Sequence, residues 1–216
     1  MEKKHLLILE NELKALKQEE NVRGVMLMGS VAYGKAVDDS DLDILVLCDR
    51  DVFISKCVDD ITVEVHYQTY ETLTNKLKTR PMEVYKYLYS KILFDDGGLE
   101  ELSLEANNRY NSYKTPEKEK ESICYWLSST KSKLLSSIER NEVVKIAYLV
   151  STNTWKVLEG VWAINNKPIP PTSIVYNTYY MLSFPLENWF YDLFMGDVLS
   201  RAYTMIKVID LICEYQ

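Results

Sequence analysis

The stretch MGSVAYGKAVDDSDLDILVL, residues 28–47, decides how this chain folds and which chemistry it can carry. It opens with an apolar residue and a Gly-Ser pair, and it ends in an apolar run that starts with Asp41 and Asp43. Side chains two positions apart on a strand project from the same face, so these two carboxylates are predicted to point together. Leu42 and Ile44 then point into a core. The stretch predicts two buried strands, with a pair of carboxylates where the second one begins.

This arrangement suits a cation and a phosphate. Two carboxylates at close range repel each other unless a cation lies between them, and oxygen ligands of this kind suit Mg²⁺. Gly29 and Ser30 offer open backbone N–H groups and a hydroxyl to a phosphate. A third carboxylate, Glu64, lies in ITVEVHY (residues 61–67), a strand that would pair beside Asp41 and Asp43. Together the three acids predict a two-metal site for phosphoryl transfer.

The same stretch nearly matches a P-loop. Gly29, Gly34 and Lys35 fit G-x-x-x-x-G-K, but Ala36 stands where a Ser or Thr would bind Mg²⁺. A P-loop also opens a helix, whereas VDDSDLD leads into a strand. The P-loop is therefore the weaker interpretation.

Outward from this stretch, the pattern predicts an α+β fold: a small mixed β-sheet with flanking helices, followed by an all-α region. Strands are expected over residues 22–28, 41–48, 61–67 and 92–94, and helices over 4–19, 70–79 and 82–90. After the turn at Gly97 and Gly98 only helical spacing follows, over 99–111, 117–139, 142–164, 174–182, 186–195 and 197–215. We expect one domain over residues 1–111 and a helical domain over 112–216.

Composition excludes several classes of protein. The chain has 216 residues and a formal net charge of −7, which argues against a general nucleic-acid binder because phosphates need Lys and Arg. No apolar run approaches the roughly 20 residues of a membrane span, and the start has no apolar signal-peptide core. We therefore expect a cytoplasmic protein with no membrane partner.

Histidine and cysteine are scarce. His5 and His66 are the only histidines, which excludes a His-rich metal site, and His66 is expected at an exposed polar position. The cysteines are scattered without a C-x-x-C pair, so free thiols are expected in place of a disulfide framework: Cys48, Cys57, Cys124 and Cys213.

The order of an apolar strand, Gly-Ser, ten residues, Asp-Leu-Asp-Ile and a later strand acid resembles the nucleotidyltransferase superfamily of DNA polymerase β. Within it, the chain looks most like the bacterial enzymes that modify antibiotics of the kanamycin and lincosamide type. The resemblance covers residues 22–98, and its motif residues are Gly29, Ser30, Gly34, Ser40, Asp41 and Asp43, with Glu64 as the third carboxylate.

The resemblance implies a function. Gly29, Ser30, Gly34 and Ser40 would bind a nucleoside triphosphate, and Asp41, Asp43 and Glu64 would hold Mg²⁺, expected as two ions. An acceptor hydroxyl would attack the α-phosphorus and release pyrophosphate. Residues 1–111 would then be the catalytic domain and 112–216 the acceptor-binding domain.

The chain departs from the family pattern at two points. Many relatives have Arg where this chain has Tyr33, which leaves the triphosphate contacts open, and the third acid is commonly Asp. Whether Glu64 is a metal ligand or the general base stays open, as does assistance from a helical-domain acid: Glu139, Glu142 or Glu159.

The resemblance implies a small-molecule acceptor, and acidic residues around a cleft would attract a cationic one, such as an aminoglycoside-like antibiotic. Two alternatives remain: a protein AMP-transferase of the same fold, and a catalytically silent nucleotide-binding or antitoxin-like interaction module. The aromatic residues of 176–194 either line a pocket or form the core. The sequence also leaves a homodimer open.

Overall fold

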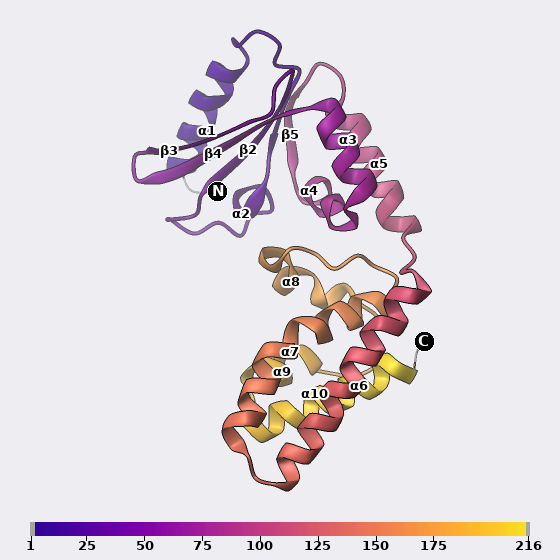
Figure 1. Ribbon diagram of the computed structural model, residues 1–216. Coiled ribbons are helices and arrows are strands. Elements are labelled where there is room, and N and C mark those ends of the chain that lie inside the picture. Colours follow the sequence, from indigo (N-terminus) through magenta and orange to yellow (C-terminus); the bar gives the residue numbers. More distant parts are fainter. Residues whose placement is uncertain (1–2, 215–216) are drawn as a thin grey trace. The chain divides into compact units, whose positions relative to one another are not determined.

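The computed structural model describes residues 3–214, which form two compact units. One unit ends at Ser112 and the other begins at Tyr113. The first holds all the strands of the described chain and the second is helical (Figure 1). The predicted α+β class is confirmed.

The sheet of the first unit has five strands in the order β3-β4-β2-β1-β5. They are β1 (Gly24–Leu27), β2 (Leu42–Cys48), β3 (Val52–Val58), β4 (Ile61–Thr69) and β5 (Lys91–Asp95). Strands β2 and β4 pair in parallel, and the other three pairs are antiparallel. The sheet is therefore mixed, as predicted.

Helices lie on both faces of this sheet (Figure 1). On one face, α1 (Lys3–Leu16) buries Ile8 and Leu9 in a cluster with Leu42, Ile44 and Val46. The other side carries α3 (Tyr70–Thr79), α4 (Val84–Leu88) and α5 (Leu99–Ser112). Because strand residues alternate, Asp43 lies on the face opposite to α1.

Strand β3 was not predicted. Its residues Val52–Cys57 are exposed and lack the alternation that marks a half-buried strand. It forms because the two-residue turn at Asp59 and Asp60, with φ of 48° and 62°, folds it back onto β4 as a hairpin. The strand lies at the edge of the sheet, where burial does not shape its sequence.

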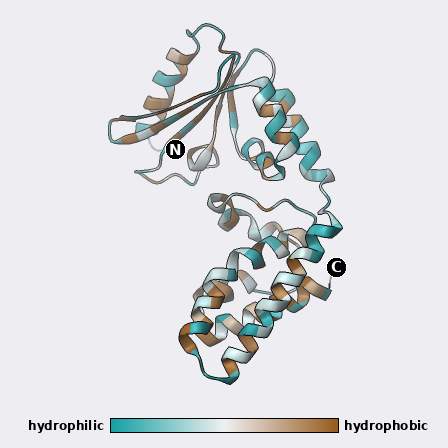
Figure 2. Ribbon diagram, viewed as in Figure 1, coloured by the Kyte–Doolittle hydropathy of each residue, from teal (hydrophilic) through white to brown (hydrophobic). Residues whose placement is uncertain are grey.

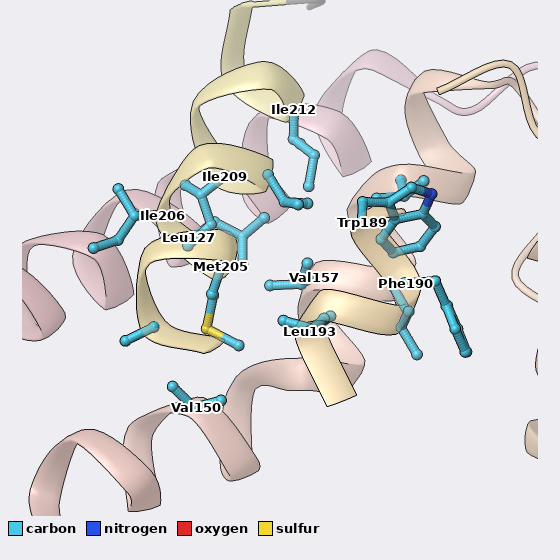
Figure 3. Close-up of a cluster of buried hydrophobic side chains, with 14 of the residues drawn as sticks. Leu127, Val150, Val157, Trp189, Phe190, Leu193, Met205, Ile206, Ile209 and Ile212 are labelled. Atoms are coloured by element: carbon cyan, nitrogen blue, oxygen red, sulfur yellow. The ribbon is translucent and has the colours of Figure 1, made fainter. Parts of the chain in front are cut away.

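The second unit packs its long helices around one hydrophobic core. It contains α6 (Glu117–Glu139), α7 (Val143–Ile164), α8 (Thr172–Thr178), α9 (Trp189–Met195) and α10 (Val198–Glu214). Leu127, Val157, Met205 and Ile209 meet in this core, and Phe190 lies in the same cluster (Figure 3). Hydrophilic and hydrophobic residues alternate along these helices, as amphipathic packing requires (Figure 2).

A disulfide joins Cys124 in α6 to Cys213 in α10, with a Cα–Cα separation of 5.6 Å. The prediction of free thiols is wrong for these two residues and holds for Cys48 and Cys57. The pair is 89 residues apart in sequence, and only the packing of the two helices brings them together. Spacing along the chain therefore carried no signal of it.

Within residues 3–214, no helix combines the length and the apolar character that a bilayer crossing demands.

Candidate active site

The parallel pairing of β2 and β4 places two carboxylates side by side. Asp43 on β2 is in register with Glu64 on β4, and neighbours in register project from the same face. His66 follows two positions along β4 and shares that face. Each of the three residues offers one ligand atom, and these atoms all lie within 4.8 Å of one another. Asp43, Glu64 and His66, called here the acidic cluster, are all half-buried.

The Gly-Ser corner packs directly against this cluster. The Met28 N–H donates to the Asp43 carbonyl at 2.8 Å, which draws the end of β1 alongside β2. Gly29 follows with a φ of +67°, and a Cβ built on it would lie 2.0 Å from Asp43 Oδ2. Glycine is therefore required at this position both by its backbone conformation and by the approach of the carboxylate. Ser30 is the next residue, in the short helix α2 (Gly29–Ala32).

The carboxylates of the site repel one another. Burial raises the pKa of Asp43 above its usual value, and the neighbouring charges of Glu64 and Asp41 raise it further. Asp41 is exposed and immediately precedes β2. Its charge acts on Asp43, but it does not belong to the acidic cluster. Carboxylates that disfavour each other in this way are stabilised by a divalent cation, which fits this donor set.

His66 lies in the site, although the sequence interpretation placed it at an exposed polar position. Its side chain is 35% exposed, and its Nε2 lies 3.8 Å from Glu64 Oε2. Burial, followed by the charge of Lys86, lowers the pKa of His66, so the imidazole is neutral at neutral pH. The two-residue alternation of Glu64 and His66 in β4 was the signal for this position.

The loop between β1 and β2 contains the remaining predicted residues. Gly34 has a φ of +75° with open space around its Cα. Ser40 is engaged within the loop: its Oγ accepts from the Val37 N–H at 2.9 Å, and its carbonyl lies 2.8 Å from His5 Nε2. Ser40 therefore shapes the turn that leads to Asp41.

Burial raises the pKa of the Tyr33 hydroxyl, and the nearby charge of Asp43 raises it further. Positive charge reaches the site from helices. Lys86 on α4 and Lys76 on α3 both help to lower the pKa of His66. Sequence reasoning missed both lysines because only the packing of α3 and α4 brings them near β4.

The candidate acids of the helical unit differ in their surroundings. Glu142 pairs with Lys145 at 2.7 Å, and Glu139 is exposed at the end of α6. Glu159 pairs with Lys156, and both line a hollow of about 330 Å³ within the helical unit, together with Tyr113 and Lys167. Of the three acids, Glu159 is the one that lines this hollow.

The mixed sheet thus holds the Gly-Ser corner against the two strand carboxylates, Asp43 and Glu64. Residues 10–95 match the family model described as "Polymerase beta, Nucleotidyltransferase". The resemblance of this region to the nucleotidyltransferase superfamily is thus confirmed, and the matched segment lies within the first unit.

Two solved structures align with 97% of this chain. One is a nucleotidyltransferase-like protein from Exiguobacterium sibiricum 255-15, with 13% identity and a TM-score of 0.44, over 97% of this chain and 74% of that chain. The other is the spectinomycin adenyltransferase AAD(9) from Enterococcus faecialis with ATP and spectinomycin, with 13% identity and a TM-score of 0.33, over 97% of this chain and 98% of that chain. At such values these similarities carry no conclusion about substrate. No curated protein sequence matches the chain.

Proposed function

We propose that this protein transfers a nucleoside monophosphate from a nucleoside triphosphate to a hydroxyl group of a small molecule, and that it releases pyrophosphate. The observation that carries this proposal is the placement of the Asp43 and Glu64 carboxylates side by side, with the bare backbone of Gly29 against Asp43. Such a site holds a divalent cation and leaves room beside it for a phosphate.

The carboxylates of Asp43 and Glu64 would hold the cation, expected to be Mg²⁺, and Asp41 would complete the site for a second ion. A bound divalent cation supplies positive charge to the triphosphate and to the leaving pyrophosphate. Ser30 would donate its hydroxyl to a phosphate oxygen, and Gly29, Gly34 and Ser40 would keep the loop in shape around it. Glu64 takes one of two roles: it holds the cation, or it accepts the proton of the attacking hydroxyl.

Lys76 and Lys86 support the assignment to a triphosphate. Many relatives have an Arg at the position of Tyr33, and these two lysines supply cationic charge near His66 in its place. Lys86 is also held at 3.0 Å from Glu83, which fixes its position on α4. The ammonium groups of these two lysines would neutralise phosphate oxygens without a cationic residue in the loop between β1 and β2.

The helical unit would bind the acceptor. The net charge of −7 supports a cationic acceptor such as an aminoglycoside-like antibiotic. Glu159 and Glu142 each line a hollow of the unit, so both are candidates for assisting the acceptor hydroxyl. Glu139, which is exposed at the end of α6, remains an alternative.

Release of pyrophosphate is the direct test. Each nucleoside triphosphate is incubated with Mg²⁺ and a panel of hydroxyl acceptors, cationic antibiotics included, with wild type and Asp43→Asn. We expect release only when a small acceptor is present, and a loss of at least about 100-fold in the variant. Pyrophosphate release that is equal in both proteins would contradict the proposal.

Two other functions would give different results. A protein AMP-transferase would label a polypeptide in a lysate supplied with radioactive ATP. A catalytically silent interaction module would copurify with a partner, and Asp41→Asn would leave that association unchanged.

A further inference from the structure

We propose that His66 is a third ligand of the cation site and that it makes this site bind first-row transition-metal dications more tightly than the carboxylates alone would. The inference rests on the proposed function, because it concerns the same site. It concerns the choice of metal, however, and can be tested without any nucleotide.

The geometry brings the imidazole within reach of a shared ion. The ligand atoms of Asp43, Glu64 and His66 lie within 4.8 Å of one another, and His66 Nε2 is 3.8 Å from Glu64 Oε2. Two ligands at right angles on one ion, with bonds of about 2.1 Å, lie about 3 Å apart. Small side-chain movements therefore suffice to close the site around one cation.

The imidazole ring is supported on its outer side. Phe53 on β3 is in register with His66 on β4, and the two ring centroids are 4.7 Å apart. On the other side, β2 presents Asp43 beside Glu64. The edge strand β3 thus packs a ring against His66 while the nitrogen Nε2 lies near the carboxylates. A packed ring loses less rotamer freedom when it binds an ion.

The donor set determines the preferred metal. Mg²⁺ favours oxygen ligands, whereas imidazole suits Zn²⁺, Fe²⁺, Ni²⁺ and their neighbours in the first transition row. Adding the imidazole to the two carboxylates therefore raises the affinity for these ions, and it contributes little to the affinity for Mg²⁺.

One other residue offers a ligand to such metals from the same face. Cys57 is an exposed free thiol on β3, where it pairs with Thr62, two positions from Glu64 on β4. Soft thiolate ligands bind transition metals. The experiment therefore uses the full chain with Cys57→Ser as the reference protein.

The test is calorimetric titration of the reference protein and of its His66→Gln variant with Co²⁺ and with Mg²⁺, in the absence of nucleotide. The visible absorption of bound Co²⁺ provides a second readout of nitrogen ligation. We expect His66→Gln to weaken Co²⁺ binding at least about 10-fold and Mg²⁺ binding less than about 2-fold. The Co²⁺ absorption bands should shift as well. Asp43→Asn is the control that should weaken both ions.

Tighter binding of Co²⁺ than of Mg²⁺ would not by itself reveal a nitrogen ligand, because nitrogen and oxygen sites follow the same general order of metals. The decisive result is the change in Co²⁺ affinity relative to Mg²⁺ affinity when His66 is replaced. Equal weakening of both ions, unchanged Co²⁺ binding, or absence of Co²⁺ binding in the reference protein would overturn the inference. Selective weakening without pyrophosphate release in any assay would support the metal site and contradict the proposed function. Pyrophosphate release without selective weakening would do the reverse.

Discussion

At the scale of single residues, Gly29 joins the fold to the chemistry. Its left-handed backbone costs a non-glycine residue about 1–2 kcal/mol, and a methyl group there would also meet Asp43 Oδ2 at 2.0 Å. Gly34 has a similar φ of +75° but open space around it. The two glycines thus separate the effect of backbone strain from the effect of contact with the carboxylate.

Gly29→Ala should therefore destabilise the protein by more than Gly34→Ala. We expect about 1 kcal/mol for Gly34→Ala, from backbone strain alone, and about 2–4 kcal/mol for Gly29→Ala, from strain and displacement of Asp43. Chemical denaturation of both variants measures the difference. Equal losses would show that Asp43 does not press on the Gly-Ser corner.

The site residues also show what a sequence pattern can predict. Gly29, Ser30, Asp43 and Glu64 were predicted because each fits a local pattern with a known chemical use. Ser40 has such a pattern too, yet its hydroxyl serves the loop. His66 shares the face of Glu64 by the alternation of β4, but its place beside Asp43 depends on the register of β4 with β2.

At the scale of elements, Asp51 holds the start of α3. Its carboxylate accepts from the Thr69 N–H at 3.0 Å and from Thr72 Oγ1 at 2.7 Å. These hydrogen bonds lower the pKa of Asp51 below its usual value. Because the folded pKa is depressed, the stabilisation is present above the unfolded pKa of about 3.9 and is lost as the pH falls through the folded pKa.

Asp51→Asn should therefore destabilise the protein at pH 7 by less than about 1 kcal/mol, since the carboxylate is exposed and water screens its charge. The difference from wild type should shrink as the pH is lowered below about 3.9. Urea denaturation at pH 7 and at stepwise lower pH checks this. A difference that stays constant with pH would show that the carboxylate charge has no part in fixing α3.

The disulfide between Cys124 and Cys213 constrains the positions of α6 and α10 relative to each other. Loss of a disulfide that closes a loop of this length costs about 2–4 kcal/mol. We expect a reductant to lower the unfolding midpoint of wild type, and to leave a Cys124→Ser/Cys213→Ser variant unchanged. A wild-type midpoint that does not respond to reductant would contradict the link between the two helices.

Most elements were predictable because burial imposes a pattern on their residues. Helix α3 begins and ends where its spacing indicated, and β2 and β4 carry the apolar residues of strands covered by helices. Strand β3 and the disulfide escaped prediction for a common reason. Strand β3 forms by pairing with β4, and the disulfide forms because α10 brings Cys213 to Cys124. Neither contact leaves a recognisable pattern in the residues of β3 or around Cys124.

At the scale of the whole molecule, the two units have different proposed roles. The first unit holds the sheet, the acidic cluster and residues 10–95, which match the nucleotidyltransferase family model. The second unit is a helical body with its own core, and its proposed part is to bind the acceptor. Composition and element pattern do not identify the acceptor, because acceptor specificity depends on individual side chains, whereas helical folds of this kind serve many functions.

The central claim is that Asp43, with Glu64 and Asp41 beside it, binds the cations that hold a nucleotide, and it can be tested without any acceptor. Calorimetry measures the binding of each nucleoside triphosphate, with and without Mg²⁺, to wild type and to Asp41→Asn/Asp43→Asn. We predict binding that requires Mg²⁺ and falls at least about 10-fold in the double variant. Binding of equal strength in the double variant would contradict the assignment of the two aspartates.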